Sequence, residues 1–136
     1  MQGRGFVGSK YDRDVDVKEI AKRLRTEIKE AVKKGELPQG KYSVTIDRYS
    51  MGQSIDIRIT ELEGPIMNPG YDHMSSDPEL RYFYAPKVRV AIEKLREMKE
   101  AYNRDNSDIM TDYFDVKFYG SVDVDYRLLA KELKAA

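Results

Sequence analysis

The sequence contains no cysteine and no tryptophan, and His73 is its single histidine. Without cysteine, the chain can form neither a disulfide framework nor a thiolate metal site, so its stability must come from a packed core. No apolar run approaches the ~20 residues that a membrane-spanning helix requires. Residues 1–10 are polar and rich in glycine, and they lack the apolar stretch of a signal peptide. We therefore expect a cytoplasmic protein that has no membrane partner.

Recognisable catalytic and cofactor-binding motifs are missing as well. The glycines form neither a phosphate-binding loop nor a dinucleotide-binding pattern. Ser50 lies within a predicted hairpin, not at the strand-to-helix turn of a nucleophile elbow. His73 has no residue at a spacing typical of a catalytic triad or a metal site, so a surface histidine without a role is the favoured interpretation. The sequence therefore predicts neither an enzyme nor a bound cofactor.

Charge is balanced in total but unevenly distributed. The chain of 136 residues carries 24 basic and 24 acidic side chains. Residues 1–60 hold 13 basic against 9 acidic side chains, whereas residues 61–136 hold 11 against 15, so the halves differ in sign. Such polarity influences the choice of partner more than the fold. The length suits one domain, and we expect a flexible N-terminal arm over residues 1–13 followed by a single domain over residues 14–136.

Alternating apolar residues predict a β-hairpin over residues 41–60. A period of two places one face of each strand in the core and the other face in water. The four residues 50–53 form the expected connection, which is longer than a two-residue turn, and Gly52 is its expected residue of positive φ. The apolar positions of the two strands are Tyr42, Val44, Ile46, Ile55, Ile57 and Ile59.

The buried face of this hairpin needs cover, which an amphipathic first helix supplies. Asp16 and Glu19 have the spacing of a capping box, which predicts that the helix begins there. Gly35 is suited to end the helix, and Pro38 prevents its continuation. The apolar residues at helical spacing are Val17, Ile20, Ala21, Leu24, Ile28, Ala31 and Val32.

Two further helices are predicted after the hairpin. Residues 61–76 form an irregular excursion, and Asp77 followed by Pro78 opens a short helical turn. Pro86 begins a longer helix that ends near residue 103. Asp125 is the expected N-cap of a final helix. Its apolar residues are Leu128, Leu129 and Leu133.

Residues 113–124 give the second β signal of the chain. Their apolar residues and Gly120 all occupy even positions, which one long strand bent at Gly120 explains more simply than a hairpin. The predicted order is therefore helix, strand, strand, helix, strand, helix. This order indicates an α+β fold with a three-stranded, mainly antiparallel sheet and helices packed on one face. The other face of the sheet is then free to contact another macromolecule.

A basic stripe runs along the predicted first helix. At about 100° per residue, five basic side chains fall on one line beside the apolar face. The stripe suits a phosphate backbone or an acidic protein surface. A solubilising helix exterior is the favoured explanation, and the zero net charge disfavours strong nonspecific binding to nucleic acid. The five residues are Lys18, Lys22, Arg25, Lys29 and Lys33.

An acidic cluster lies in the second half of the chain. Six aspartates and one cation, Lys117, occur between residues 105 and 125. Asp115, Asp123 and Asp125 are expected on one side of the predicted long strand. They suit a hard-cation site, a mimic of nucleic-acid phosphates, or solvent-side charge that prevents edge-to-edge association. The third interpretation is favoured and the metal site is the least favoured.

Tyrosines are abundant, with ten in the chain. Residues 82–84 together with Tyr113 and Tyr119 could supply a contact surface for a protein or for stacked bases. Core packing next to the second helix is the favoured alternative, because aromatic side chains mostly serve burial.

Three stretches of the sequence resemble one known family. They are residues 16–25 (DVKEIAKRLR), the hairpin positions 42–44 and 49–57, and residues 102–108 continuing into 111–116. Over about residues 15–124 the chain resembles the large polyvalent protein-associated domains of the twenty-ninth type. That family occurs in phages, plasmids and conjugative elements, alone or fused beside anti-restriction and DNA-modifying modules. The resemblance carries over no catalytic residue.

The resemblance implies a small phage or mobile-element protein that binds a host defence complex and interferes with it, as anti-restriction or anti-CRISPR proteins do. The alternative is an accessory nucleic-acid-binding domain that uses the basic stripe. A homodimer is a further expectation, because the long strand at a sheet edge could pair across a two-fold axis. The candidate binding residues are Lys18, Lys22, Arg25, Lys29, Lys33, Tyr49, Ser50, Asn106, Asp108, Asp115, Tyr119 and Asp123.

Overall fold

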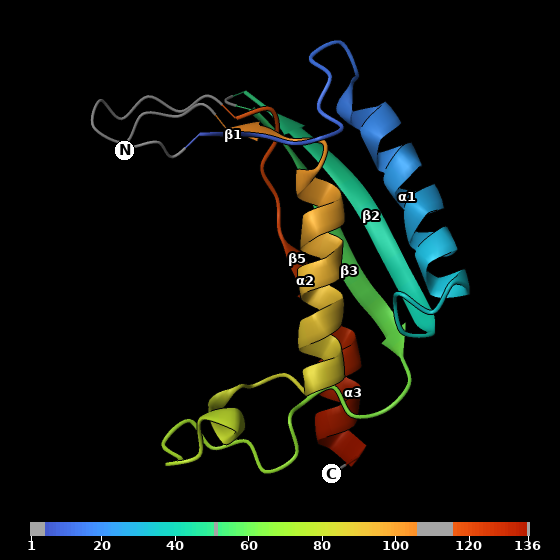
Figure 1. Ribbon diagram of the computed structural model, residues 1–136. Helices are drawn as coiled ribbons and strands as arrows, with labels where there is room; N and C mark the ends of the chain where they lie inside the picture. Colours follow the sequence, from blue (N-terminus) through green and yellow to red (C-terminus); the bar gives the residue numbers. More distant parts are fainter. Residues whose placement is uncertain (1–4, 51, 106–115, 136) are drawn as a thin grey trace.

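A computed structural model describes residues 5–50, 52–105 and 116–135 of the chain. The predicted α+β fold and the order of its six main elements are confirmed, and two short strands pair beside them (Figure 1). The elements are β1 (Phe6–Val7), α1 (Val17–Lys33), β2 (Gly40–Tyr49), β3 (Gly52–Leu62), a 3₁₀ turn η1 (Pro78–Arg81), α2 (Pro86–Glu100), β4 (Arg104–Asp105), β5 (Val122–Val124) and α3 (Tyr126–Ala135).

The hairpin of β2 and β3 is antiparallel, as predicted, and its register runs from Gly40–Leu62 to Tyr49–Gly52. Because Tyr49 pairs directly with Gly52, only positions 50 and 51 lie between the strands. The expected four-residue connection is therefore wrong, and Gly52 is not among the glycines with positive φ. Its small size serves packing instead, because a Cβ there would lie 3.3 Å from the ring of Tyr119.

The third strand completes a mixed sheet in the order β2-β3-β5. β5 runs parallel to β3, with Ile57 opposite Val122 and Ile59 opposite Val124. These four side chains are buried, so one face of the sheet forms the core. Within the described residues, the predicted strand over 113–124 shortens to β5, preceded by isolated bridges at Val116 and at Tyr119. Residues 113–115 of that prediction lie outside the described part.

Buried polar side chains explain why the chain before β5 is not a regular strand. Asn103 is 3% exposed, and its side-chain amide donates to the Phe118 carbonyl at 2.9 Å. The Asn103 Oδ1 atom accepts the Phe118 N–H at 3.2 Å. Lys99, which is 4% exposed, donates to the Gly120 carbonyl at 3.1 Å. Side chains from the end of α2 therefore take backbone groups that a neighbouring strand would otherwise pair with.

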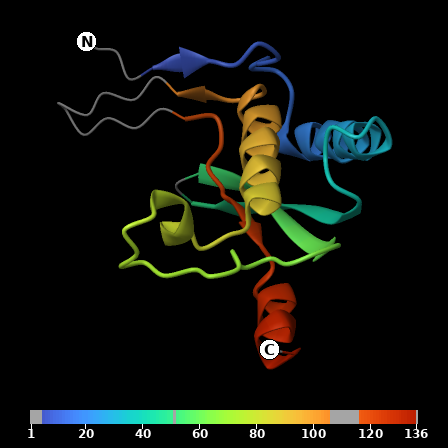
Figure 2. The same cartoon turned by 60° about the horizontal axis from the view of Figure 1, so that its bottom comes forward.

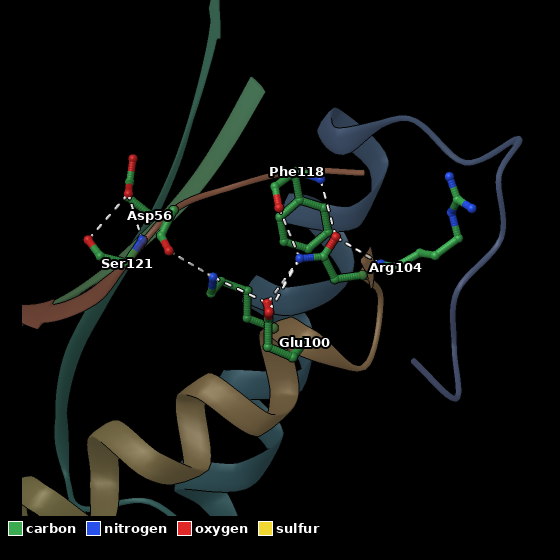
Figure 3. Close-up of polar contacts among 8 residues, drawn as sticks. Asp56, Glu100, Arg104, Phe118 and Ser121 are labelled. Atoms are coloured by element: carbon green, nitrogen blue, oxygen red, sulfur yellow. Dashed lines mark hydrogen bonds and ion pairs between the residues drawn. The ribbon is translucent and has the colours of Figure 1, made fainter. Parts of the chain in front are cut away.

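Gly120 turns the chain back toward β3. Its φ is +131°, and a Cβ at this position would overlap the carbonyl of Ile55. Directly after it, the Ser121 N–H donates to the Asp56 carboxylate at 3.0 Å (Figure 3). The bend that the sequence predicts at Gly120 therefore has two causes, its left-handed conformation and its contact with the β3 backbone.

Helices α1 and α2 cover the apolar face of the sheet, whereas α3 extends away beyond β5 (Figure 2). α1 begins after Asp16 as predicted, but the reciprocal bonds of a capping box do not form. The Asp16 carboxylate binds Arg48 at 2.6 Å instead, and Glu19 binds Arg23 at 3.1 Å. In α3, Leu128 and Leu129 pack against the core, but Leu133 is 51% exposed, contrary to its predicted place in the apolar stripe.

The segment before α1 lies against the end of α2. β1 pairs with β4 in antiparallel register, and the Gly8 N–H donates to the Asn103 carbonyl at 2.8 Å. Lys10 reaches Glu27 of α1 at 3.2 Å. These contacts connect residues 5–10 to both helices. Among the described residues, no helix combines the length and apolarity needed to cross a bilayer.

Candidate functional site

Helix α1, which carries the basic stripe, lies beside β2, and β2 forms one edge of the three-stranded sheet (Figure 1). The five side chains of the stripe, Lys18, Lys22, Arg25, Lys29 and Lys33, are all exposed. Arg25 shows which way the stripe faces, because its guanidinium donates to the Val44 carbonyl of β2 at 2.7 Å. The opposite flank of α1 carries Glu27 and Glu30 and borders α2. α1 therefore turns its basic flank toward the sheet edge and a flank of mixed charge toward the other helix.

The hydrogen-bond pattern of β3 shows which backbone groups β2 presents at this edge. The N–H groups of Ile55 and Ile57 donate to the carbonyls of Tyr119 and Ser121 on the β5 side. In an antiparallel pair of strands, residues whose N–H and C=O groups point toward the partner strand alternate with residues whose groups point away from it, and two directly opposite residues are always of the same kind. By the register, the backbone groups of Tyr42, Val44 and Ile46 then point away from β3. No described strand pairs with this outer side of β2.

A groove of about 560 Å³ separates α1 from the first half of β2. Ile28 and Val32 of α1 line one wall, and Tyr42 and Val44 of β2 line the other. Arg25, Lys29 and Lys41 stand at its rim. A second hollow of about 400 Å³ continues along the first half of α1, and Arg25 borders both hollows. We name the first of them, with its apolar walls and basic rim, the α1–β2 groove.

The stripe keeps most of its charge available. Among the described residues, Lys18, Lys22, Lys29 and Lys33 form no ion pair. Two acids near the groove are already neutralised. Lys41 pairs with Glu61 at 3.4 Å, and Asp16 pairs with Arg48. Of the three rim cations, Lys41 is thus paired with Glu61, whereas Arg25 and Lys29 form no ion pair with any described residue.

The pKa of Asp16 reflects the charges near the start of α1, beyond the α1–β2 groove. Asp16 is exposed, and the desolvation that acts to raise the pKa of its carboxyl group is outweighed by the charge and hydrogen bond of Arg48 and by backbone hydrogen bonds from Val17 and Lys18. The pKa of Asp16 therefore lies below its ordinary value, and the carboxylate stays ionised at neutral pH. The Asp16–Arg48 pair connects the start of α1 to the end of β2.

Two predicted binding residues, Tyr49 and Tyr119, come together at the tip of the hairpin. Their rings flank Gly52, where an added Cβ would lie 3.5 Å from Tyr49 and 3.3 Å from Tyr119. The rings are 47% and 40% exposed, and Ser50 is exposed beside them. By strand alternation these tyrosines belong to the open face of the sheet, not to the α1–β2 groove.

The described aspartates of the predicted acidic cluster differ in their surroundings. Asp125 is 8% exposed and caps α3 by accepting the Arg127 N–H at 2.9 Å. Its pKa is lowered, first by that backbone hydrogen bond and then by the Arg127 side chain. Asp123 lies exposed on the open face, opposite Arg58 in the register. Within the described residues no three His, Cys, Asp or Glu side chains could hold a metal ion together. Asn106, Asp108 and Asp115 lie outside the described residues.

The excursion between β3 and α2 is held by packing and by hydrogen bonds. Tyr71, Phe83 and Tyr84 form edge-to-face contacts at 5.2 and 5.3 Å between ring centroids. Tyr82 is 51% exposed, and the Arg89 guanidinium lies 4.0 Å from the centre of its ring. His73 is exposed. The aromatic residues 82–84 thus divide between packing and surface.

The chain matches no protein-family model, no curated protein and no solved structure. Fold and site define it as an α+β protein with a mixed three-stranded sheet and a basic groove along one sheet edge. No family model supports the predicted resemblance to the large polyvalent protein-associated domains, which stays a prediction that rests on three sequence stretches. The third of these, from residue 102 to residue 116, lies mainly outside the described part of the chain.

The site contains features that the stripe did not reveal. The apolar walls, Ile28, Val32, Tyr42 and Val44, read as ordinary core positions in the sequence. The apolar spacing of the first helix and of β2 predicted the burial of these residues, but not that α1 would leave a groove beside the sheet edge. Which flank of α1 faces β2 depends on how the helix packs. The sequence contained one indication of a site at this position, which was the difference between the basic flank and the mixed flank of the first helix.

Proposed function

We propose that this protein is a non-catalytic binding protein, which acts by occupying a surface of another protein through the α1–β2 groove. The observation that carries the proposal is the combination of apolar walls with a basic rim, on which Arg25 and Lys29 form no ion pair with any described residue. Protein interfaces combine an apolar centre with a polar, charged rim, and the groove offers both within one hollow. Charge at a rim steers the encounter and selects partners of opposite sign.

The setting follows from the sequence resemblance, which is to domains of phages and other mobile elements. Proteins of such elements act against host defence, so the proposed target is a restriction or CRISPR effector complex. Many such complexes handle nucleic acid, and inhibition requires no chemistry if a bound protein blocks a working surface. This fits the absence of catalytic motifs from the sequence.

A phage-plating assay tests this function. The protein is expressed in bacterial strains that carry an active restriction system or an active CRISPR system, and plaques of a targeted phage are counted. We expect plating to recover in at least one strain, and to be lost again in the double variant Lys22→Glu, Lys29→Glu. The matched control is Lys131→Glu, Lys134→Glu, which makes the same charge change at two exposed positions of α3. No recovery in any strain, or equal loss in both variants, contradicts the proposal.

The second candidate function is nucleic-acid binding along α1. The observation that favours it is the regular row of lysines that form no ion pair with any described residue, a row that spans about 22 Å from Lys18 to Lys33 at about 1.5 Å per residue. A salt series with duplex DNA and single-stranded RNA separates the two functions. Phosphate contacts make affinity fall steeply with salt, and Lys22→Glu, Lys29→Glu would flatten that slope. If the first proposal is correct, nucleic acid binds weakly at physiological salt. The variant Lys22→Glu, Lys29→Glu and the control variant Lys131→Glu, Lys134→Glu then bind it equally weakly.

A further inference from the structure

The outer edge of β2 offers more than charge, because backbone donors and acceptors alternate along it. The N–H and C=O groups of Tyr42, Val44 and Ile46 point away from β3. A long exposed strand edge is a template for a further strand, and proteins usually protect it. Within the described part of the chain, the centre of this edge is protected by one side-chain contact, from Arg25 to the Val44 carbonyl at 2.7 Å. Arg25 is solvent-exposed, so this contact can open without disturbing the core.

We propose that the α1–β2 groove receives an extended acidic segment of the partner protein, which adds to the edge of β2 as a further strand of the sheet. This inference rests on the proposed function and names the chemistry of the partner. Strand addition takes its affinity from main-chain hydrogen bonds and its specificity from pockets for alternate side chains. Both are available at this edge.

The two sides of an added strand would meet different surroundings. Its side chains facing α1 would lie among Lys22, Arg25 and Lys29, next to the apolar walls of the groove. Its side chains on the open face would lie beside Thr45 and Asp47, which are both exposed. Carboxylates therefore suit the first side and uncharged polar residues suit the second. The favoured segment alternates acidic and uncharged residues with a period of two.

Charge also selects against other occupants. If a second copy paired edge to edge across a two-fold axis, the two α1 stripes would stand side by side on the same face of the joined sheet. Like charges facing each other oppose that arrangement. A phosphate backbone could contact the lysines but offers no amide donors to the outward carbonyls of β2. An acidic polypeptide satisfies both the lysines and the strand edge.

Arg25 has two roles in this arrangement. In the free protein its guanidinium occupies the Val44 carbonyl and blocks the edge. On binding, an amide of the added strand takes that carbonyl, and the guanidinium moves to a carboxylate of the same strand. A hydrogen bond from arginine to a carboxylate is stronger than one to a neutral carbonyl, so the exchange favours an acidic segment.

The test uses two synthetic octapeptides with blocked ends and identical composition. One alternates Glu and Thr, and the other places all Glu before all Thr. We expect the alternating peptide to bind about tenfold more tightly, because only it can direct every carboxylate toward α1. Hydrogen exchange followed by NMR should show new protection of the Tyr42, Val44 and Ile46 amides. Lys22→Glu with Lys29→Glu should abolish binding, whereas Lys131→Glu with Lys134→Glu should preserve it.

Other results overturn the inference. Equal affinity for the two peptides, or binding without amide protection, indicates simple charge attraction. Protection in concentrated protein without peptide indicates a second copy, and protection by single-stranded DNA alone indicates nucleic acid. If neither peptide binds while phage plating still depends on Lys22 and Lys29, strand addition is wrong and the proposed function stands. If plating does not depend on these lysines, the proposed function itself fails.

Discussion

Two phenol groups, those of Tyr42 and Tyr102, lie where ionisation is costly. The Tyr42 hydroxyl donates to the Pro38 carbonyl at 2.7 Å, and burial raises the pKa of Tyr42 to about 12. The pKa of Tyr102 is also raised to about 12, first by burial and then by its hydrogen bond to the Glu27 carboxylate and the charge of that group. Both phenols therefore stay neutral in the fold well above the ordinary tyrosine pKa of about 10.

This predicts how stability depends on alkaline pH. In the unfolded chain both phenols lose a proton near pH 10, whereas in the fold they keep it until about pH 12. The raised pKa values thus contribute stability that is complete below about pH 10 and is lost as the pH rises toward 12. Tyrosinate absorbance should show late-ionising tyrosines, and their number should fall by one in Tyr42→Phe. Ionisation of every tyrosine near pH 10 while the protein remains folded would contradict the prediction.

Gly120 needs both a positive φ and space next to Ile55, and comparison with Gly35 separates the costs of these two requirements. It has a φ of +131° and no room for a Cβ against Ile55, whereas Gly35 has a φ of +79° and no atom within 4 Å of an added Cβ. We expect Gly35→Ala to lower the free energy of unfolding by about 1 kcal/mol, the cost of left-handed backbone alone. Gly120→Ala should cost more than about 3 kcal/mol, because overlap is added to strain. Urea denaturation of both variants measures this, and equal costs would show that the contact with Ile55 relaxes.

These positions also show what the sequence can reveal about a single residue. The glycine at position 120 suggested a bend, and Gly120 has a positive φ there, but the even spacing around it predicted a longer strand than the three residues of β5. The prediction for Gly52 was wrong because a glycine next to a turn has two common uses. It can adopt positive φ, or it can leave space for its neighbours. Gly52 has the second use, because the rings of Tyr49 and Tyr119 occupy the space next to it. Tyr119 lies 67 positions further along the chain, so no local pattern indicates this contact.

At the scale of elements, Glu132 connects α3 to the excursion between β3 and α2. Its two carboxylate oxygens accept the N–H groups of Ile66 and Met67 at 2.6 and 2.7 Å. Ile66 is 1% exposed, so this contact holds the first buried residue of the excursion in place. Because α3 has no fully buried residue of its own, the contact also helps to fix the helix.

Glu132→Ala should therefore loosen the excursion more than the core. Hydrogen bonds to a charged acceptor contribute about 1.5–3 kcal/mol, and the variant loses both. We expect the Ile66 and Met67 amides to exchange faster, while the Ile57 amide in β3 keeps its protection. Glu132→Gln keeps one acceptor oxygen and should show an intermediate rate. Glu93→Ala on the exposed side of α2 is the control, and loss of protection throughout the sheet in Glu132→Ala would contradict a local role.

Long periodic elements were predictable and short ones were not. The hairpin and the first two helices each repeat their apolar residues often enough to fix both type and face. β1 and β4 have two residues each, too few to carry any period, and they exist because the end of α2 places them together. β5 shortened because Lys99 and Asn103 take backbone groups of the preceding segment, a contact that no local pattern reveals. The groove likewise depends on packing.

For the whole molecule, the charge distribution bears on self-association. The expected dimer used the 113–124 strand, but β5 has three residues, whereas β2 at the other edge has ten. β2 is therefore the edge that could join two copies. The basic stripe of α1 stands over that edge and would face its own image. The zero net charge of the whole chain does not indicate this repulsion, because the acidic residues that balance the stripe lie in other parts of the chain.

We therefore predict a monomer of 15.8 kDa at low salt and an edge-to-edge dimer once the stripe is neutralised. The variant Lys22→Ala, Arg25→Ala, Lys29→Ala removes the repulsion and also exposes the Val44 carbonyl to a second strand. Sedimentation equilibrium should show stronger dimerisation of this variant than of the native chain, and the difference should narrow in 1 M salt, where the screening length falls to about 3 Å. Lys131→Ala with Lys134→Ala should remain monomeric. A native dimer at low salt, or a monomeric stripe variant, would show that charge on α1 does not guard the edge of β2.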